Sequence, residues 1–503
     1  MKSVLKRWIR KRLNGYREVV NHVDPSKPLR SASPRTVAVV GGGLAGIGAA
    51  SLLGERGFKV TLFDKNPYLG GKVGSWPVAF TDGFKTQVDH GFHAFFRHYY
   101  NLSRFLEKLG SDRYLERIDD YLILGKQGRN YGFSEVETTP VLNVFSLARQ
   151  GFFSFQEVLF NRHAAQLRAL LQYDRDRTFE DWDHMSYDEF ADRAHLPAGL
   201  KLVFATFARA FFAPGDKLSM AELIKSFHFF YLSNDCGLLY DYLTCNYQEA
   251  LLDPVRARLE VNGVRVKLGS PVEGVARTHG VFVVDGQEFD YVILAADVVG
   301  VRQIAEKSVW IEESAPDLHR QLTQLQESQG YAVFRLWLDK RVGQEFPVFV
   351  ITEKQQVLDS ITFYHQFDTE ARKWAEETGG GVYELHCYAL PPALPTEAEV
   401  RGAFRNELND YLPELRDARV LYDHLQVKRD FTAFHCNLSN DRPSSETAIA
   451  NLYLAGDWVK LPVPAMLMEG AFTSGLLSAN AILTANGLRE EAVLSVPRKG
   501  IFA

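Results

Sequence analysis

Residues 37–64, VAVVGGGLAGIGAASLLGERGFKVTLFD, contain the parts of a dinucleotide-binding unit in one uninterrupted run. The apolar residues 37–40 predict a buried parallel strand, and glycines then follow in the spacing G-x-G-x-x-G. The first glycine permits a tight turn, the second lets the backbone approach a pyrophosphate, and the third lets the helix pack closely on the strand. The cofactor contacts that this run predicts are Gly41, Gly43, Leu44, Ala45 and Gly46.

An acidic residue ends the second apolar strand of the same run. Asp64 follows residues 60–63, and its carboxylate is placed to accept hydrogen bonds from an adenosine ribose, with Lys65 beside it. Strand, glycine turn, helix and acid occur in the order that the motif requires. We therefore expect a dinucleotide site here, in preference to a glycine-rich turn that binds nothing.

Two further segments favour FAD as the dinucleotide. Gly70 and Gly71 let the backbone lie against a second phosphate or a ribityl chain, and Lys72 can neutralise the negative charge there. A second apolar segment ends in Gly456 and Asp457, which puts a carboxylate at the carboxyl edge of a parallel sheet, where it could bind ribityl hydroxyls. Taken alone, this pair is more typical of an ordinary turn after a strand.

A helix is expected to begin near the sequence Met468, Glu469, Gly470. The free N–H groups in the first turn of this helix could stabilise negative charge at the N1/O2 side of a reduced flavin. These three residues are therefore further candidates for cofactor contact.

Residues 89–102, DHGFHAFFRHYYNL, resemble a segment of plant and cyanobacterial-type carotene desaturases, within the FAD-dependent amine oxidase and carotenoid desaturase superfamily. The segment is closer still to bacterial β-carotene desaturase/methyltransferases of the isorenieratene synthase type. Further matches are residues 204–213, 451–458 and 468–475, so the resemblance extends from about 36 to about 485. Lys72 stands where the family usually has Arg, and Asp64 where it often has Glu; both are chemically close.

The resemblance implies additional cofactor contacts. It places Gly91, Phe92 and His93 along the flavin ring, makes Val272 a backbone contact to adenine, and brings the chain at Ala295 close to the cofactor.

The resemblance also suggests the catalytic candidates His90, His93 and Arg209. Either histidine could act as an acid or base or steady a developing carbocation, but a structural histidine that bonds the backbone is the more common case. Arg209 could face FAD phosphates or hold a quinone or a substrate end, and a salt-bridge role is the alternative.

The expected fold is α/β, with a Rossmann-type FAD-binding domain like that of amine oxidases and an inserted mixed α+β substrate domain. The pattern between 256 and 305 predicts strands at 264–266, 272–275, 281–284 and 291–296, which returns the chain to the first domain. The expected divisions are a basic segment and linker at 1–35, an FAD-binding domain at 36–110, 256–305 and 441–490, and a substrate domain that faces the membrane at 111–255 and 306–440.

Composition agrees with a large enzyme. The 503 residues can form two or three domains, and 35 phenylalanines suggest an aromatic-lined interior. A hydrocarbon channel could be walled by Phe145, Phe152, Phe153, Phe155, Phe211, Phe212, Phe227, Phe229, Phe230 and Tyr231, although each alone is more typical of helix core. Four cysteines show no metal spacing, so no metal site is expected, and a net charge of −5 gives no reason to expect nucleic acid.

Residues 1–14, MKSVLKRWIRKRLN, are basic and amphipathic. Such a helix suits an anionic membrane surface, with a plain solvated helix as the alternative. No stretch reaches about 18 uninterrupted apolar residues, which predicts a soluble or peripheral protein. We expect it in the cytoplasm, peripherally associated with the inner membrane through this helix and an apolar channel mouth.

A single dinucleotide motif suggests that electrons enter from the substrate and leave to a quinone or oxygen. The sequence therefore predicts an FAD-dependent oxidoreductase that desaturates a carotenoid or related isoprenoid hydrocarbon, with methyl migration to an aromatic end ring in the closest subfamily. Three alternatives remain: a flavin amine oxidase with a small closed pocket, a redox-neutral FAD-dependent carotene isomerase, and a non-catalytic lipid-binding flavoprotein.

Overall fold

The computed structural model describes residues 2–503 except for 119, 121, 126–129, 133–135, 152, 155, 157–163, 210, 237–238, 344–345 and 395. The side chains of 131, 164–165, 202–203 and 205–208 are also outside the description. Two of the expected channel residues, Phe152 and Phe155, therefore lie outside the described residues, as does Ala210 of the segment 204–213.

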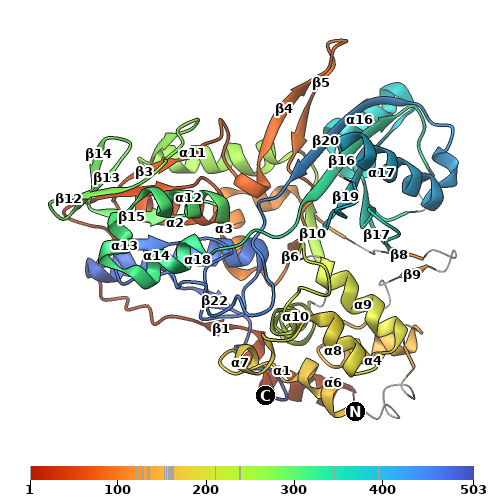
Figure 1. The fold of residues 1–503 in the computed structure, drawn as a ribbon, viewed down its shortest axis with the longest axis horizontal. Helices are drawn as coiled ribbons and strands as arrows, with labels where there is room; N and C mark the ends of the chain where they lie inside the picture. The colour runs from red at the N-terminus through yellow and green to blue at the C-terminus, as the bar shows by residue number, and fades with distance from the viewer. Residues whose placement is uncertain are drawn as a thin grey trace.

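Five strands of the described chain form a parallel sheet in the order β11-β3-β2-β15-β21 (Figure 1). Their bounds are β2 Thr36–Val40, β3 Lys59–Phe63, β11 Arg265–Lys267, β15 Tyr291–Leu294 and β21 Leu452–Leu454. Strands β2 and β15 are almost wholly buried, because apolar layers cover both faces of the sheet. The Rossmann-type fold class predicted from the glycine run is therefore confirmed.

Successive residues of β2 point into opposite layers of this domain. Val37 and Val39 pack in the layer of helices α2 (Leu44–Glu55) and α18 (Leu467–Ala485), whereas Ala38 and Val40 face the other layer. That layer contains β12 Ala276–Thr278, β13 Val281–Val284, β14 Gln287–Phe289, α12 Val298–Lys307, α13 Trp310–Ser314 and α14 Pro316–Thr323. Residues 272–275, predicted as a strand, instead form an irregular segment that leads into β12.

A second sheet carries the other half of the molecule. Seven strands of the described chain follow the order β20-β16-β19-β18-β17-β8-β9, and neighbours are antiparallel except β17 and β8. Their bounds are β8 Leu122–Leu124, β9 Tyr131–Gly132, β16 Tyr331–Leu338, β17 Phe349–Thr352, β18 Ser360–Phe363, β19 Gly381–Cys387 and β20 Val420–Lys428. Helices α15 Tyr364–Phe367, α16 Thr369–Thr378 and α17 Glu397–Tyr411 accompany it. Phe404 and Leu408 of α17 pack on one face with Phe334 and Leu336.

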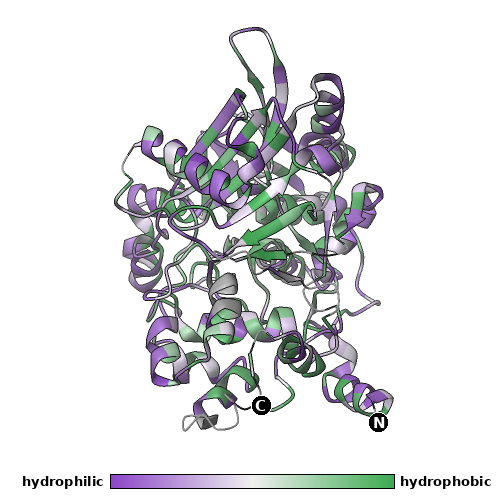
Figure 2. Cartoon of the chain, turned by 90° about the vertical axis from the view of Figure 1, so that its right-hand side faces the viewer, coloured by the Kyte–Doolittle hydropathy of each residue, from purple (hydrophilic) through white to green (hydrophobic). Residues whose placement is uncertain are grey.

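Short helices and strands join the two sheets. The helices are α3 Tyr100–Leu109, α4 Leu142–Arg149, α6 Ala164–Leu167, α7 Thr178–Trp182, α8 Tyr187–Arg193, α9 Ala198–Arg209, α10 Met220–Phe227 and α11 Asp253–Val261. The strands are the hairpin β4 Ser75–Ala79 and β5 Lys85–Asp89, and a three-stranded sheet in which β10 Tyr240–Leu243 lies between β6 Phe95–Phe96 and β7 Leu115–Arg117. A π-helical turn at His228–Leu232 follows α10. Figure 2 shows hydrophobic strands inside and mixed hydropathy on the outer helices.

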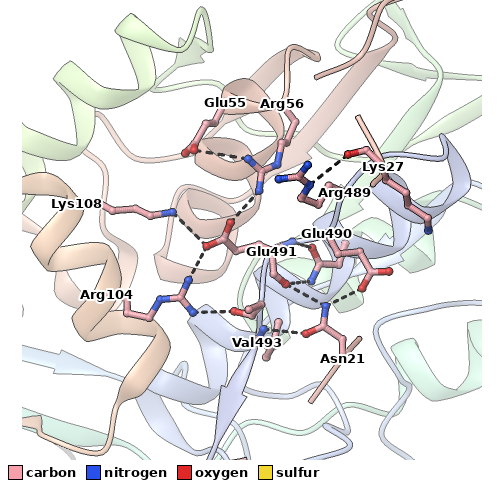
Figure 3. Close-up of polar contacts among 12 residues, drawn as sticks. Asn21, Lys27, Glu55, Arg56, Arg104, Lys108, Arg489, Glu490, Glu491 and Val493 are labelled. Carbon is pink, nitrogen blue, oxygen red and sulfur yellow. Dashed lines mark hydrogen bonds and ion pairs between the residues drawn. The ribbon is translucent and has the colours of Figure 1, made fainter. Parts of the chain in front are cut away.

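The two ends of the chain lie on the same side of the molecule (Figure 1). Strand β1 (Glu18–Val19) pairs with β22 (Leu494–Ser495), and α1 (Lys2–Arg12) packs its Ile9 against Ile501. Figure 3 shows the polar contacts behind this pairing, centred on Glu491. Its carboxylate bonds Arg56 at 2.8 Å, Arg104 at 2.7 Å and Lys108 at 3.3 Å, which fixes the chain after α18 to α2 and α3.

Candidate active site

One cavity of about 1030 Å³ reaches from the glycine turns of the parallel sheet to the mixed sheet. Gly43 and Asp64 line its first part, whereas Val333 and Ile351 line its second. A cavity that joins two domains is the usual setting of a cofactor with its substrate. The predicted site residues that line it are His90, His93, Arg209, Gly41, Gly43, Leu44, Ala45, Asp64, Lys65, Gly70, Gly71, Lys72, Gly91, Phe92, Val272, Ala295, Gly456, Asp457 and Met468.

The three glycines of the motif differ in what surrounds them. Gly41 has φ +115°, and a Cβ there would lie 2.4 Å from the Ala295 carbonyl oxygen. A Cβ at Gly43 would meet nothing within 4 Å, so the start of α2 is open to the cavity. A Cβ at Gly46 would lie 1.8 Å from the Gly41 oxygen. Gly46 does not line the cavity, and its role in the structure is the close packing of α2 on the turn.

Asp64 is buried at the end of β3 and is held by the glycine turn. The backbone N–H of Gly42 donates to Oδ2 at 2.7 Å, and that of Asn66 donates to Oδ1 at 2.7 Å. Burial raises the pKa of the Asp64 carboxyl above its usual value despite these two donors. The carboxylate is thus fixed beside the open start of α2.

The second glycine segment lies alongside the first. The N–H of Gly70 donates to the Gly42 carbonyl at 2.8 Å, and Gly70 has φ +102°. Next to it, burial acts to lower the pKa of Lys72, but Asp457, Asp430 and Asp297 outweigh burial and raise it. Lys72 is therefore a charged ammonium group on the wall of the cavity.

The segment after β21 reaches the cavity through some of the predicted residues. Gly456 has φ +150° and donates its N–H to Ser474 Oγ at 2.7 Å, and Thr432 donates to Asp457 Oδ1 at 2.9 Å. Glu469 and Gly470 do not line the cavity. The Glu469 carboxylate instead accepts the N–H groups of Asn101 at 2.9 Å and Leu102 at 3.0 Å. Glu469 therefore caps the start of α3, where an acid satisfies free N–H donors.

These groups fit FAD. The start of α2 is open at Gly43, so its N–H groups could hold a pyrophosphate, and the buried Asp64 could hold a ribose. Lys72 could balance phosphate charge, and Asp457 lies at the carboxyl edge of the sheet, where it could meet the ribityl chain.

His90 and His93 lie together on the cavity wall, with ring centroids 6.3 Å apart. His90 Nε2 lies 2.9 Å from Tyr331 Oη, which itself donates to Asp430 at 2.9 Å. His93 Nδ1 lies 2.7 Å from the Gly91 carbonyl oxygen. Burial lowers the pKa of His90 well below its usual value and that of His93 to about 4. Both imidazoles are therefore neutral near pH 7.

Sequence reasoning missed a buried ionic group beneath these histidines. Arg335 of β16 pairs with Glu384 of β19, with Nε to Oε2 at 2.9 Å. Glu384 also accepts the N–H of Phe92 at 2.7 Å and bonds His386 Nε2 at 3.0 Å. The sequence feature that could have revealed this ion pair is one charged residue inside each of two otherwise apolar strands, YAVFRLWL and GVYELHC.

Arg209 is held by contacts on the cavity wall. Its Nη1 donates to the Thr352 carbonyl at 2.9 Å, and its Nε lies 3.5 Å from Oδ1 of Asp359, which is fully buried. The guanidinium is thus fixed in position by an ion pair and a backbone carbonyl.

The rest of the wall is largely aromatic and aliphatic. It includes Phe96, Phe212, Phe230, Tyr231, Tyr240, Phe349, Ile351 and Leu467. Three of these, Phe212, Phe230 and Tyr231, belong to the predicted channel set. Phe153, Phe211, Phe227 and Phe229 are buried away from the cavity, and Phe145 is exposed.

His98 offers a test of how burial affects stability. Its side chain is 1% exposed among Phe229 and Phe230, and neither ring nitrogen has a hydrogen-bond partner among the described residues. Burial lowers the pKa of His98 to about 3. Because the unfolded chain binds the proton near pH 6.5, stability is full above that pH and falls between 6.5 and about 3.

We expect His98→Phe to raise the free energy of unfolding at pH 7 by about 1–3 kcal/mol, since two unsatisfied nitrogens are removed. The gain should be about 2 kcal/mol larger at pH 5. Urea unfolding of the apoprotein at both pH values measures this, with the exposed His184→Phe as the control. An equal change at pH 7 and pH 5 would contradict the expectation.

Among the residues that the structure describes, no helix is long and apolar enough to cross a membrane. Within the same residues, no cluster of three or more His, Cys, Asp or Glu side chains could hold a metal ion.

Several known proteins are similar to this chain in sequence or in fold. A carotenoid phi-ring synthase of Streptomyces griseus is 36% identical, over 92% of this chain and 90% of that protein. A carotenoid phi-ring synthase of Chlorobaculum tepidum is 28% identical, over 94% of this chain and 92% of that protein. A solved structure of putrescine oxidase bound to putrescine, 16% identical, has a TM-score of 0.63 and covers 90% of this chain and 99% of its own.

The fold and the cavity define an FAD-dependent oxidoreductase. The chain belongs to the flavin containing amine oxidoreductase family, which matches residues 44–483. The predicted cofactor, FAD, and the predicted resemblance are therefore confirmed.

Proposed function

We propose that this enzyme desaturates the end ring of a cyclic carotenoid, with a methyl migration that makes the ring aromatic. The observation that carries the proposal is the 36% identity, over 92% of this chain, to a protein named carotenoid phi-ring synthase. The largely apolar wall of the cavity supports it, because a hydrocarbon gains free energy from leaving water.

FAD, when bound, supplies a two-electron acceptor for hydride. We propose that the backbone at Gly41, Gly43, Leu44 and Ala45 holds its pyrophosphate and that Asp64 holds its ribose, with Val272 near adenine and Asp457 near the ribityl chain. The openness of the start of α2 at Gly43 supports this assignment. Lys65, Gly70, Gly71, Lys72, Gly91, Phe92, Ala295, Gly456 and Met468 complete the proposed contact set.

We propose that His90 and His93 act at the substrate side of this cavity. Both are kept neutral by burial, so each presents an uncharged imidazole to a hydrocarbon and could steady a developing carbocation. Arg209 is proposed to fix one end of the substrate or of a quinone, which its place on the cavity wall supports; its ion pair with Asp359 is the salt-bridge role given as the alternative. The electron acceptor is proposed to be a quinone or oxygen.

We propose that α1 attaches the protein to the cytoplasmic face of the inner membrane. Trp8 is 51% exposed and Val4 67% exposed, and the basic residues Arg7, Arg10 and Lys11 are exposed on the same helix. Apolar side chains next to cations are typical of a helix that lies in an anionic lipid surface.

We expect the triple variant Arg7→Ala, Arg10→Ala, Lys11→Ala to bind anionic vesicles about 100-fold more weakly, since each basic residue contributes about 1 kcal/mol near such a surface. Sedimentation with phosphatidylglycerol vesicles at low salt measures the loss. Lys340, Lys373 and Arg416, exposed near the mixed sheet, provide a matched control triple. Equal binding of the two triple variants would contradict membrane attachment through α1.

Anaerobic reduction of the flavin tests the proposed reaction. The FAD-loaded protein in liposomes is mixed separately with β-carotene, γ-carotene, lycopene or phytoene, and flavin bleaching is followed with product analysis. Bleaching with a β-ring carotene and an aromatic-ring product is expected. Bleaching with linear carotenes only would indicate a chain desaturase, and bleaching with amines only an amine oxidase. Isomerised carotene without net oxidation would indicate the isomerase, and binding without reaction a lipid-binding flavoprotein.

A further inference from the structure

Three histidines of the cavity wall differ in their hydrogen-bond partners, and the partner fixes which ring nitrogen carries the proton. His386 Nε2 lies 3.0 Å from Glu384 Oε1. An ionised carboxylate can only accept, so Nε2 of His386 carries a hydrogen, and in the neutral imidazole the lone pair is then on Nδ1. His386 lines the cavity, and its Cε1 would lie 3.1 Å from a Cβ built on Gly91.

The two other histidines are less suited to take up a proton. His90 donates from Nε2 to Tyr331 Oη, because the Tyr331 hydroxyl hydrogen is directed to Asp430. His93 donates from Nδ1 to the carbonyl oxygen of Gly91, a neutral partner. Of these three imidazoles, His386 alone is backed by a carboxylate, which stabilises the imidazolium once a proton arrives.

Glu384 is itself fixed as a carboxylate. It is fully buried between Arg335, whose Nε and Nη2 lie 2.9 Å and 2.6 Å from Oε2, and the N–H of Phe92. Burial acts to raise the pKa of Glu384, but Arg335 and His386 lower it to about 2. Glu384 therefore stays ionised and joins the segment at Phe92 to the ring of His386.

We propose that His386 Nδ1 accepts the protons that the substrate ring loses, and that Glu384 is the positioning residue that sets its tautomer. The inference rests on the proposed function. Each new double bond requires that a ring carbon lose a hydride, which bound FAD would accept, and that a carbon next to the resulting cation lose a proton. In the round with methyl migration, the methyl group first moves with its bonding pair to the cationic carbon, so the cation shifts to the carbon that it left, and the carbon that received the methyl group is the neighbour that loses the proton. The C–H electron pair of that neighbour becomes the π bond, and the proton moves to Nδ1. A quinone or oxygen, the proposed acceptors, would take up the two electrons of each round before the next begins.

The tautomer is measured first, without cofactor or substrate. In apoprotein labelled with ¹⁵N-histidine, the His386 signals are assigned by their loss in His386→Ala. We expect a protonated Nε2 and an unprotonated Nδ1. Glu384→Gln should move the hydrogen to Nδ1, because the amide group can donate toward Nε2. A protonated Nδ1 in the wild-type protein would overturn the proposal.

Single-turnover bleaching with β-carotene then tests the proton transfer. His386→Ala should slow bleaching at least about 100-fold with unchanged FAD content, and added imidazole should restore part of the rate. The control is His365→Ala, a buried histidine on the neighbouring segment that bonds Val382 and does not line the cavity. If His386→Ala bleaches the flavin at the wild-type rate, the role of His386 is overturned and the proposed function is not. No bleaching by the wild-type enzyme with any β-ring carotene overturns the proposed function as well.

Discussion

Replacing Gly46 with alanine is expected to give a protein that is less stable and is purified with little or no FAD. The new Cβ would lie 1.8 Å from the Gly41 carbonyl oxygen and 3.3 Å from Val39 Cγ1, so the glycine turn must move. Overpacking of this kind costs about 1–3 kcal/mol or more. The flavin-to-protein absorbance ratio and the thermal midpoint of the apoprotein measure both effects.

Gly43→Ala separates cofactor binding from folding. A Cβ at Gly43 would meet nothing within 4 Å, and φ is −76°, so the apoprotein should keep its thermal midpoint. The methyl group would nevertheless occupy the open start of α2 and should sharply reduce the FAD content. Gly402→Ala, on the exposed side of α17, is the control and should retain both FAD and stability. If Gly46→Ala were purified with the wild-type content of FAD, the role assigned to the glycine turn in cofactor binding would be contradicted.

Replacing Glu222 with alanine is expected to lower the free energy of unfolding by about 3–5 kcal/mol. Glu222 is fully buried between Lys225 and Arg442, and Arg442 Nη2 lies 2.8 Å from its Oε1. Removal of the carboxylate would leave two cations in the interior without their partner. Urea unfolding of the apoprotein at pH 7 measures the loss.

An exposed ion pair provides the comparison for Glu222. The Asp417 carboxylate lies 2.9 Å from Lys340 Nζ at the surface, where water screens the pair, so Asp417→Ala should cost far less stability than Glu222→Ala. The triple variant Glu222→Ala, Lys225→Met, Arg442→Met should recover most of the stability, because no charge then stays buried alone. A loss below 1 kcal/mol in Glu222→Ala would show that the two cations find other partners or water.

The sequence was most informative where function requires contiguous residues. The glycine run, the acid that ends β3 and the Gly456-Asp457 pair could be located because backbone conformation and ligand contact constrain neighbouring positions. The same spacing predicted separate roles for its glycines, and the structure agrees with them: Gly43 opens to the cavity, whereas Gly46 serves packing and does not line the cavity.

Residues brought together by tertiary contacts could not be predicted in this way. Arg335 and Glu384 become neighbours only through the register of β16 and β19, two strands of one sheet that are some fifty residues apart in the chain. Glu469 has the position expected of a flavin contact, yet its side chain turns away because the start of α3 offers free N–H donors. Local sequence can mark Arg335 and Glu384 as charged residues inside apolar strands, but it does not record which residue each of these side chains contacts.

The strand order of the parallel sheet constrains how the protein is made. Its central strands β2 and β15 come from residues 36–40 and 291–294, and its edge strand β21 comes from 452–454. Pairings across such long sequence separations form slowly and leave strand edges uncovered until the last partner arrives. A nascent chain therefore exposes the edge of β15 until about nine-tenths of it has been synthesised, so a complete cofactor site can form only at the end of synthesis.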